Sequence, residues 1–176
     1  MPRSHRPRKR YVPKRVEIDP MGAAHARASL LPPAGRLELV LPLRAALDRL
    51  RTGKGDWNAW CAIADALNVA ERLAEAGIAS DRAAEFDAAQ EALATLHTRV
   101  KDSGCWTLKG AEIRALAEGV EMHEVQLEVC TQGEMADAIF SVQRYVAQAL
   151  AGNAPRSARI CVAGLLGQQA EREPTC

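Results

Sequence analysis

The chain has few aromatic residues and no long apolar run. Phe, Trp and Tyr together supply only seven of its 176 residues, whereas Ala alone supplies 33. Strands favour aromatic and β-branched residues, and Ala is the best helix former. No apolar run approaches the roughly 18 to 20 residues that a membrane-spanning helix needs. The composition therefore predicts an all-α protein that does not enter a membrane.

The chain also lacks paired cysteines. Its five cysteines are single and far apart, at positions 61, 105, 130, 161 and 176. This spacing favours neither a disulfide framework nor a zinc site, and it is typical of a protein in a reducing cytoplasm. Cys61 and Cys130 fall among helical apolar residues, so we expect them to act as small core side chains.

Acidic residues are absent from positions 1–16, which carry seven basic side chains. The whole chain has 23 basic and 22 acidic residues; without those seven, 16 basic residues face 22 acidic ones, and residues 17–176 sum to −6. The near-neutral total thus hides a basic N-terminal arm on an acidic body. The acids Glu17 and Asp19 and the missing apolar stretch argue against a signal or transit peptide.

Proline content and apolar periodicity divide the chain into three parts. Residues 1–36 hold six of the nine prolines and predict an extended basic arm. Residues 37–152 predict a helical bundle domain, and residues 153–176 a C-terminal tail with one short helix near 158–169. No secretory leader, repeat or low-complexity tract is expected.

The bundle should contain about five helices that alternate in direction. Apolar residues recur every three or four positions in 37–52, 56–76, 80–104, 110–130 and 131–152. Asp56 is a good N-cap, Gly77 a good C-terminal cap, and Thr131 with Glu134 a capping box. Pro42 fits if it lies in a first helical turn. Short links between such helices favour an antiparallel bundle.

The arm is the first candidate binding site, because its charge and its single aromatic ring suit a nucleic acid. Basic side chains attract phosphate regardless of base sequence, and a tyrosine ring can stack on an unpaired base. A solvated tail, a contact with the acidic body, and binding to an acidic protein or lipid surface are the alternatives. The candidate residues are Arg6, Arg8, Lys9, Arg10, Tyr11, Lys14 and Arg15.

A row of acids in the fourth predicted helix is the second candidate site. Its members are Glu118, Glu121, Glu124 and Glu128, preceded by Glu112. Their spacing of three and four residues places them along one side of a helix, where they should form an unpaired acidic face. Such a face is either simply solvated or docks a basic partner, including the arm of a second copy in a homo-oligomer. The Glu-x-x-His pairs of di-iron bundles are absent, which argues against a metal.

Nothing in the chain resembles an enzyme motif, and we expect neither a cofactor nor catalysis. There is no nucleophile elbow and no phosphate-binding loop. His123 and His97 occupy positions typical of core histidines. Trp57, Trp60 and Trp106 should fill the core, although Trp57 becomes an interface anchor if Trp106 does not cover it.

The basic run 8–14, the run Leu67-Asn68-Val69-Ala70-Glu71 and the segment 116–127 around Met122-His123 carry a family resemblance. Over about residues 8–150 the chain resembles short, uncharacterised bacteriophage and prophage proteins. The resemblance implies a small viral accessory protein in a bacterial cytoplasm that binds host or phage proteins or nucleic acid. It implies no catalytic residues.

Two functional hypotheses follow. In the first, the protein is a non-enzymatic interaction module whose arm binds nucleic acid or an acidic partner surface. In the second, the acidic helical face occupies the basic groove of a host defence or transcription protein and inhibits it. The identity of the partner and the oligomeric state are left open.

Overall fold

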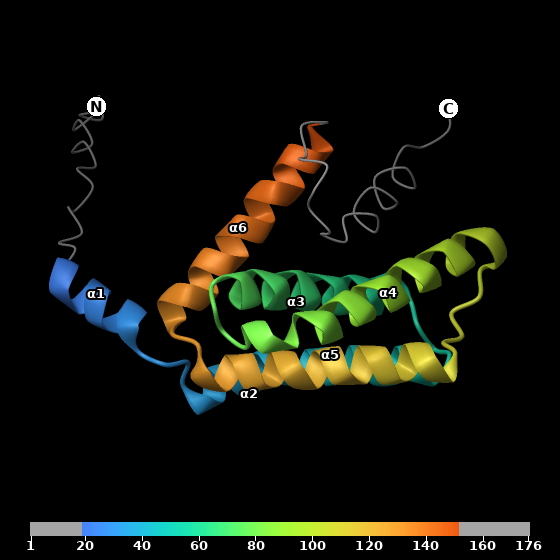
Figure 1. The fold of residues 1–176 in the computed structure, drawn as a ribbon, viewed down its shortest axis with the longest axis horizontal. Coiled ribbons are helices and arrows are strands. Elements are labelled where there is room, and N and C mark those ends of the chain that lie inside the picture. Colours follow the sequence, from blue (N-terminus) through green and yellow to red (C-terminus); the bar gives the residue numbers. More distant parts are fainter. Residues whose placement is uncertain (1–18, 152–176) are drawn as a thin grey trace, which may run out of the picture.

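The computed structural model describes residues 19–151, and within that range six α-helices and a short 3-10 helix pack together (Figure 1). The only β-type pairing among these residues is an isolated antiparallel bridge between Leu30 and Thr131. The prediction of an all-α fold is confirmed. The elements are α1 (Pro20–Ala28), α2 (Pro33–Arg51), α3 (Trp57–Glu75), η1 (Ser80–Arg82), α4 (Ala83–Ser103), α5 (Gly110–Val129) and α6 (Gln132–Leu150).

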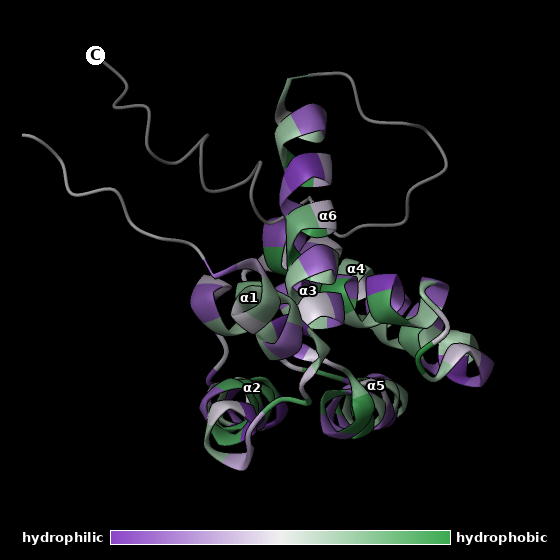
Figure 2. Ribbon diagram, turned by 90° about the vertical axis from the view of Figure 1, so that its left-hand side faces the viewer, coloured by the Kyte–Doolittle hydropathy of each residue, from purple (hydrophilic) through white to green (hydrophobic). Residues whose placement is uncertain are grey.

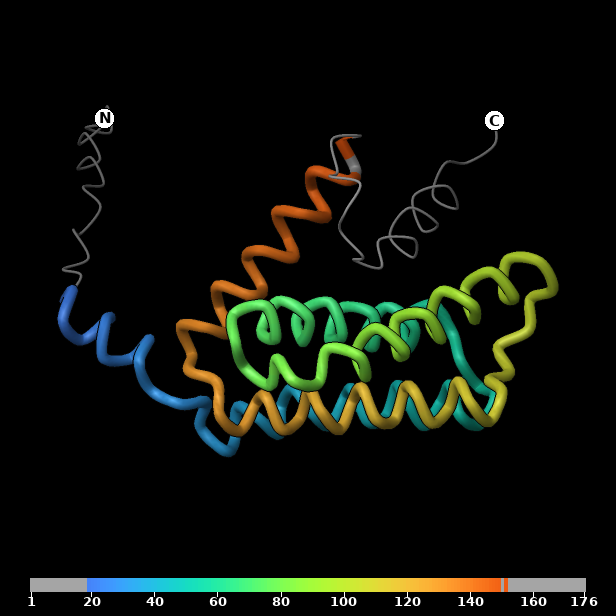
Figure 3. Tube along the Cα trace, viewed as in Figure 1, coloured from blue at the N-terminus to red at the C-terminus, as the bar shows by residue number. Residues whose placement is uncertain are grey.

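Helices α2 to α5 form a two-layered bundle in which successive helices run in opposite directions. An end-on view shows α2 and α5 side by side in one layer, with α3 and α4 in the other (Figure 2). The chain trace runs back and forth through these four helices before α6 leaves the bundle at a steep angle (Figure 3). This arrangement leaves one side of α6 facing α3 and another facing α1.

Helix α3 lies at the centre of the molecule and contacts α2, α4, α5 and α6. Its apolar residues face several directions, so ten of its 19 residues are buried. Trp60 is only 1% exposed, and its indole N–H donates to the carbonyl of Leu93 on α4 at 3.1 Å. Cys61 is half-buried against the core cluster that contains Trp60, and Cys130 is buried in a second cluster with Leu73 and Leu127, as expected from their apolar neighbours.

The predicted helix ends are confirmed where a capping residue specifies them. The Asp56 carboxylate accepts the backbone N–H of Ala59 at 2.8 Å and begins α3. Gly77 and Gly104 have φ values of 97° and 67°, a left-handed conformation that favours glycine. Thr131 and Glu134 form the predicted capping box at the start of α6.

The prediction that residues 1–36 form one extended arm is wrong at its C-terminal end. Residues 20–28 are helical, and α2 begins at Pro33 rather than at about Leu37. Pro20 and Pro33 each occupy a first helical position, where the missing N–H costs nothing because that donor has no intrahelical partner. Asp19 further caps α1 by accepting the N–H of Met21 at 3.1 Å.

The early start of α2 also corrects the expected place of Pro42. This residue lies inside the helix, not in its first turn. A proline there removes one backbone hydrogen bond and crowds the carbonyl four residues earlier, at a typical cost of about 3 kcal/mol. Burial of Leu43, Ala46 and Leu50 against the bundle compensates for that loss.

Candidate functional site

The arm residues predicted to bind an anionic partner lie outside residues 19–151, as does the short helix predicted near 158–169. The former are Arg6, Arg8, Lys9, Arg10, Tyr11, Lys14 and Arg15. The structure does describe the helix that follows the arm, and it shows how that helix is held.

Helix α1 is fixed to the beginning of α6. The Arg27 guanidinium donates to both carboxylate oxygens of Asp137, at 2.7 and 2.8 Å. The N–H of Gln132 donates to the carbonyl of Ser29 at 2.8 Å. A side chain at Gly133 would stand 2.9 Å from the carbonyl oxygen of Arg27, so this glycine permits the close approach. The body therefore holds residue 19 at one defined end of the molecule (Figure 1).

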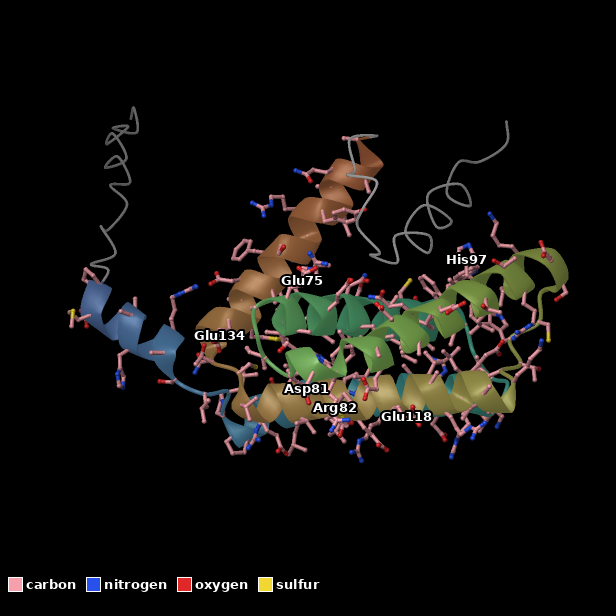
Figure 4. All side chains as sticks on the ribbon, in the orientation of Figure 1. Glu75, Asp81, Arg82, His97, Glu118 and Glu134 are labelled. Carbon is pink, nitrogen blue, oxygen red and sulfur yellow. The ribbon has the colours of Figure 1, made fainter. Side chains whose placement is uncertain are left out.

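Two of the four acids in the α5 row, Glu124 and Glu128, are paired with arginines, which corrects the sequence prediction of an unpaired face. Arg44 of α2 forms a bidentate pair with Glu124, with distances of 2.7 and 2.5 Å. Arg36 lies 3.9 Å from Glu128. Glu118, on α5 (Figure 4), and Glu121 are exposed carboxylates of this face.

Glu112, the first acid of the row, faces the other way. Its carboxylate accepts two hydrogen bonds from Arg99 of α4, one of them at 2.5 Å, and another from the backbone N–H of Lys109 at 2.7 Å. Burial alone would raise the pKa of the Glu112 carboxyl, but these hydrogen bonds lower it. Glu112 therefore joins α4 to α5 and does not belong to an exposed binding face.

An apolar groove of about 550 Å³ lies between α2, α3 and α6. Side chains from these helices line its walls, and His123 of α5 lies at its inner side. Pockets of this size and apolar character are typical of small-molecule sites. The lining residues are Leu39, Pro42, Leu43, Ala62, Asp65, Ala66, Val69, His123, Met135, Ile139, Val142, Gln143, Val146 and Ala147.

Among the described residues that line this groove, Asp65 is the only one whose side chain carries a formal charge at neutral pH in its usual ionisation state. Burial by the surrounding apolar walls raises the pKa of its carboxyl. No ion pair within residues 19–151 includes Asp65. Asp65 is nevertheless exposed, so its carboxylate is an acceptor that solvent reaches along the groove.

His123 is held in one orientation by its neighbour Gln126. The Gln126 amide donates to the carbonyls of Ala70 and Ile78, at 3.0 and 2.9 Å, so its oxygen is left as an acceptor. That oxygen lies 3.2 Å from His123 Nδ1, which must then carry the proton. Burial lowers the pKa of His123 and outweighs the opposing effects of Gln126 and Glu124. The ring is therefore neutral at pH 7, with Nε2 as an unprotonated acceptor.

The tryptophans form a core cluster with His97, as predicted. Trp57 packs edge-on against Trp60 and Trp106, with ring centroids 6.0 and 5.1 Å apart. Trp106 therefore covers Trp57, which argues against the interface-anchor alternative. His97, on α4 (Figure 4), contacts both Trp57 and Trp60, and burial lowers its pKa, with a smaller effect from Lys101.

Sequence reasoning missed the groove and the two arginines that pair with Glu124 and Glu128 of the acidic row. A usable signal for the groove was present in α3, because Ala62, Ala66 and Val69 form a second apolar face with Asp65 in its middle. The positions of Arg36 and Arg44 carry no such signal, since pairing with α5 depends on how two distant helices are placed.

Neither metal binding nor a family assignment adds to this picture. Among residues 19–151, no group of three or more His, Cys, Asp or Glu side chains is arranged to hold a metal ion. In the same range, no helix is both long and apolar enough to cross a membrane. Comparisons of the chain with protein-family models, curated proteins and solved structures find no match.

Proposed function

We propose that the protein is a non-enzymatic interaction module, a phage or prophage accessory protein in which the helical body presents the basic arm to an anionic partner. That partner is a nucleic acid or an acidic protein surface. The seven basic residues within positions 1–16 supply the charge. Helix α1, fixed to α6 through Arg27 and Asp137, supplies a defined point of attachment.

The observation that carries the proposal is the pairing of Arg44 with Glu124 and of Arg36 with Glu128. These contacts neutralise part of the face that would otherwise attract the arm or fill a basic groove in another protein. Electrostatic attraction between the arm and its own body is therefore weakened. The pairing favours an external partner for the arm over both competing hypotheses.

Fluorescence anisotropy with labelled single-stranded and duplex DNA, over a salt series, tests the proposal. If all seven basic residues contact duplex phosphates, the logarithm of the binding constant should fall with a slope of about −6 against the logarithm of salt concentration. A variant in which the seven residues are replaced by Gln keeps the arm length and should lose binding. Its circular dichroism should match that of the wild-type chain.

Polyglutamate is the second probe and separates the two classes of partner. Binding of polyglutamate without binding of DNA would assign an acidic protein surface. Failure of both probes to bind at low salt, or equal binding by the Gln variant, would overturn the proposal.

The inhibitor hypothesis has less support, because only Glu118 and Glu121 of the acidic row remain as exposed carboxylates without an ion pair among the described residues. It predicts that a variant from which residues 1–16 have been deleted still captures a host protein. Charge reversal at Glu118 and Glu121 should then abolish capture. Capture that depends on the arm and survives this reversal would eliminate the inhibitor hypothesis.

A further inference from the structure

The groove between α2, α3 and α6 plays no part in the proposed role of the arm, and its dimensions restrict what it can hold. Its α6 wall extends from Met135 to Ala147, twelve residues that rise about 18 Å in a helix. An apolar body of that length can lie along the groove between α2 and α6.

Among the described residues that line the groove, the walls are aliphatic and include no Phe, Tyr or Trp. Leu39 and Leu43 of α2 face Ile139 and Val146 of α6 across the groove, and Ala66 and Val69 of α3 lie between them. Small Ala side chains on α3 keep the space open. An unbranched or alicyclic hydrocarbon body would replace water along this length, with a gain of roughly 25 cal/mol for each Å² of apolar surface removed from solvent.

The polar groups of the groove determine which head group fits. Asp65 offers carboxylate oxygens, and the buried His123 lines the groove with a neutral ring whose Nε2 the hydrogen bond with Gln126 leaves unprotonated. Both are acceptors. Gln143 is the remaining polar lining residue and has no charge. A ligand that brings a carboxylate would meet a like charge at Asp65, whereas a ligand that brings N–H donors and a positive charge would be attracted by this carboxylate.

We propose that this groove is a binding site for an aliphatic amine, a small molecule with a protonated amino group and an apolar body. The ammonium group lies beside the Asp65 carboxylate, and the hydrocarbon follows the walls formed by α2 and α6. The site does not include the arm, so amine binding and binding of an anionic partner can be tested separately.

Isothermal titration calorimetry of the full chain with three ten-carbon probes, kept below their micelle concentrations, tests the assignment. Decylammonium is expected to bind best, decan-1-ol more weakly, and decanoate least. The substitution Asp65→Asn should weaken decylammonium binding by about tenfold to a hundredfold, because a charge-assisted hydrogen bond becomes a neutral one. Binding of decan-1-ol should not change, which also shows that the groove of this variant is intact.

Two further variants serve as controls. Glu91→Gln removes an acid from an exposed position on α4, outside the groove, and should leave all three affinities as in the wild-type chain. Ala66→Phe fills the groove and should remove binding of every probe, with circular dichroism used to confirm that the helices form. Equal affinity for decanoate and decylammonium, no effect of Asp65→Asn, or no binding of decylammonium to the full chain would each overturn the proposal.

Discussion

At the scale of single residues, a few buried polar groups connect the helices and fix each other's chemistry. Gln126 is fully buried, and its amide joins α5 to the carbonyl of Ala70 within α3 and to that of Ile78 beyond the end of α3. Those two bonds orient the amide, and the amide in turn selects the tautomer of His123. A buried polar group without such partners would cost about 1 to 3 kcal/mol. The pair therefore specifies how α3 and α5 are aligned.

The neutral state of His123 makes stability depend on pH. Burial lowers its pKa below the value of about 6.5 typical of the unfolded chain, so the unfolded state takes up a proton first as the pH falls. Above about pH 6.5 His123 is neutral in both states, and the free energy of unfolding does not depend on its titration. Below that pH the unfolded state binds one proton more than the folded state, so the free energy of unfolding falls by up to about 1.4 kcal/mol per pH unit.

We expect His123→Asn to reduce the pH dependence of the unfolding free energy, by up to the slope that the uptake of one proton produces. An Asn side chain keeps an N–H donor at the position of Nδ1 but does not titrate. Urea unfolding at several values between pH 7.5 and pH 5 measures the effect. Equal slopes for the variant and the wild-type chain would contradict a neutral, buried His123.

At the scale of elements, the close contact between α4 and α5 depends on Gly119. This residue is buried in the middle of α5, where glycine is otherwise unfavourable. A Cβ atom at this position would stand 2.6 Å from the Cβ of Ala89 and 3.1 Å from Cδ2 of Leu67. Because an Ala Cβ cannot rotate away, the two helices would have to separate.

The substitution Gly119→Ala should therefore destabilise the protein by about 1 to 3 kcal/mol, typical of overpacking. This would occur although Ala is favoured over Gly in a helix by about 1 kcal/mol. Gly35→Ala on α2 is the matched control, because its new Cβ would meet Pro32 at an ordinary 3.4 Å. Thermal and urea unfolding measure both variants. Stabilisation by Gly119→Ala would show that α4 and α5 are packed less closely than described.

At the scale of the whole molecule, packing is concentrated around α3 and is thinner along α6. Helix α3 contacts four long helices, whereas α6 contacts chiefly α3 and α1. The last buried side chain described in α6 is Val142, and Phe140 on its other side is 69% exposed. Local stability follows the number of buried apolar contacts, so it should differ between these two helices.

Amide hydrogen exchange should show this difference. Amides of α3 between Leu67 and Leu73 should exchange slowest, close to the rate set by global unfolding. Amides of α6 after Val142 should exchange much faster, through local opening that leaves the bundle intact. Exchange measured by mass spectrometry on the full chain gives both rates. Equal protection of the two segments would contradict an unequally packed body.

Local patterns in the sequence predicted the helices of the bundle well, because capping residues act over three or four positions. Asp56, Gly77 and the Thr131–Glu134 box each ended or began a helix where expected. The same reasoning failed at Pro20 and Pro33, since a proline is compatible both with an extended arm and with a first helical turn. Only the packing of α1 on α6 and of α2 on α3 and α5 distinguishes the two.

By itself, then, the sequence determined the all-α class, most helix boundaries, the core roles of His123 and the tryptophans, and the contrast between a basic arm and an acidic body. These depend on composition and on interactions between residues close in the chain. The tertiary structure decided that Arg44 and Arg36 neutralise Glu124 and Glu128, and that Asp65 lies in an apolar groove with His123. Such contacts join residues 58 to 92 positions apart, and their geometry is set by how whole helices pack rather than by any local pattern.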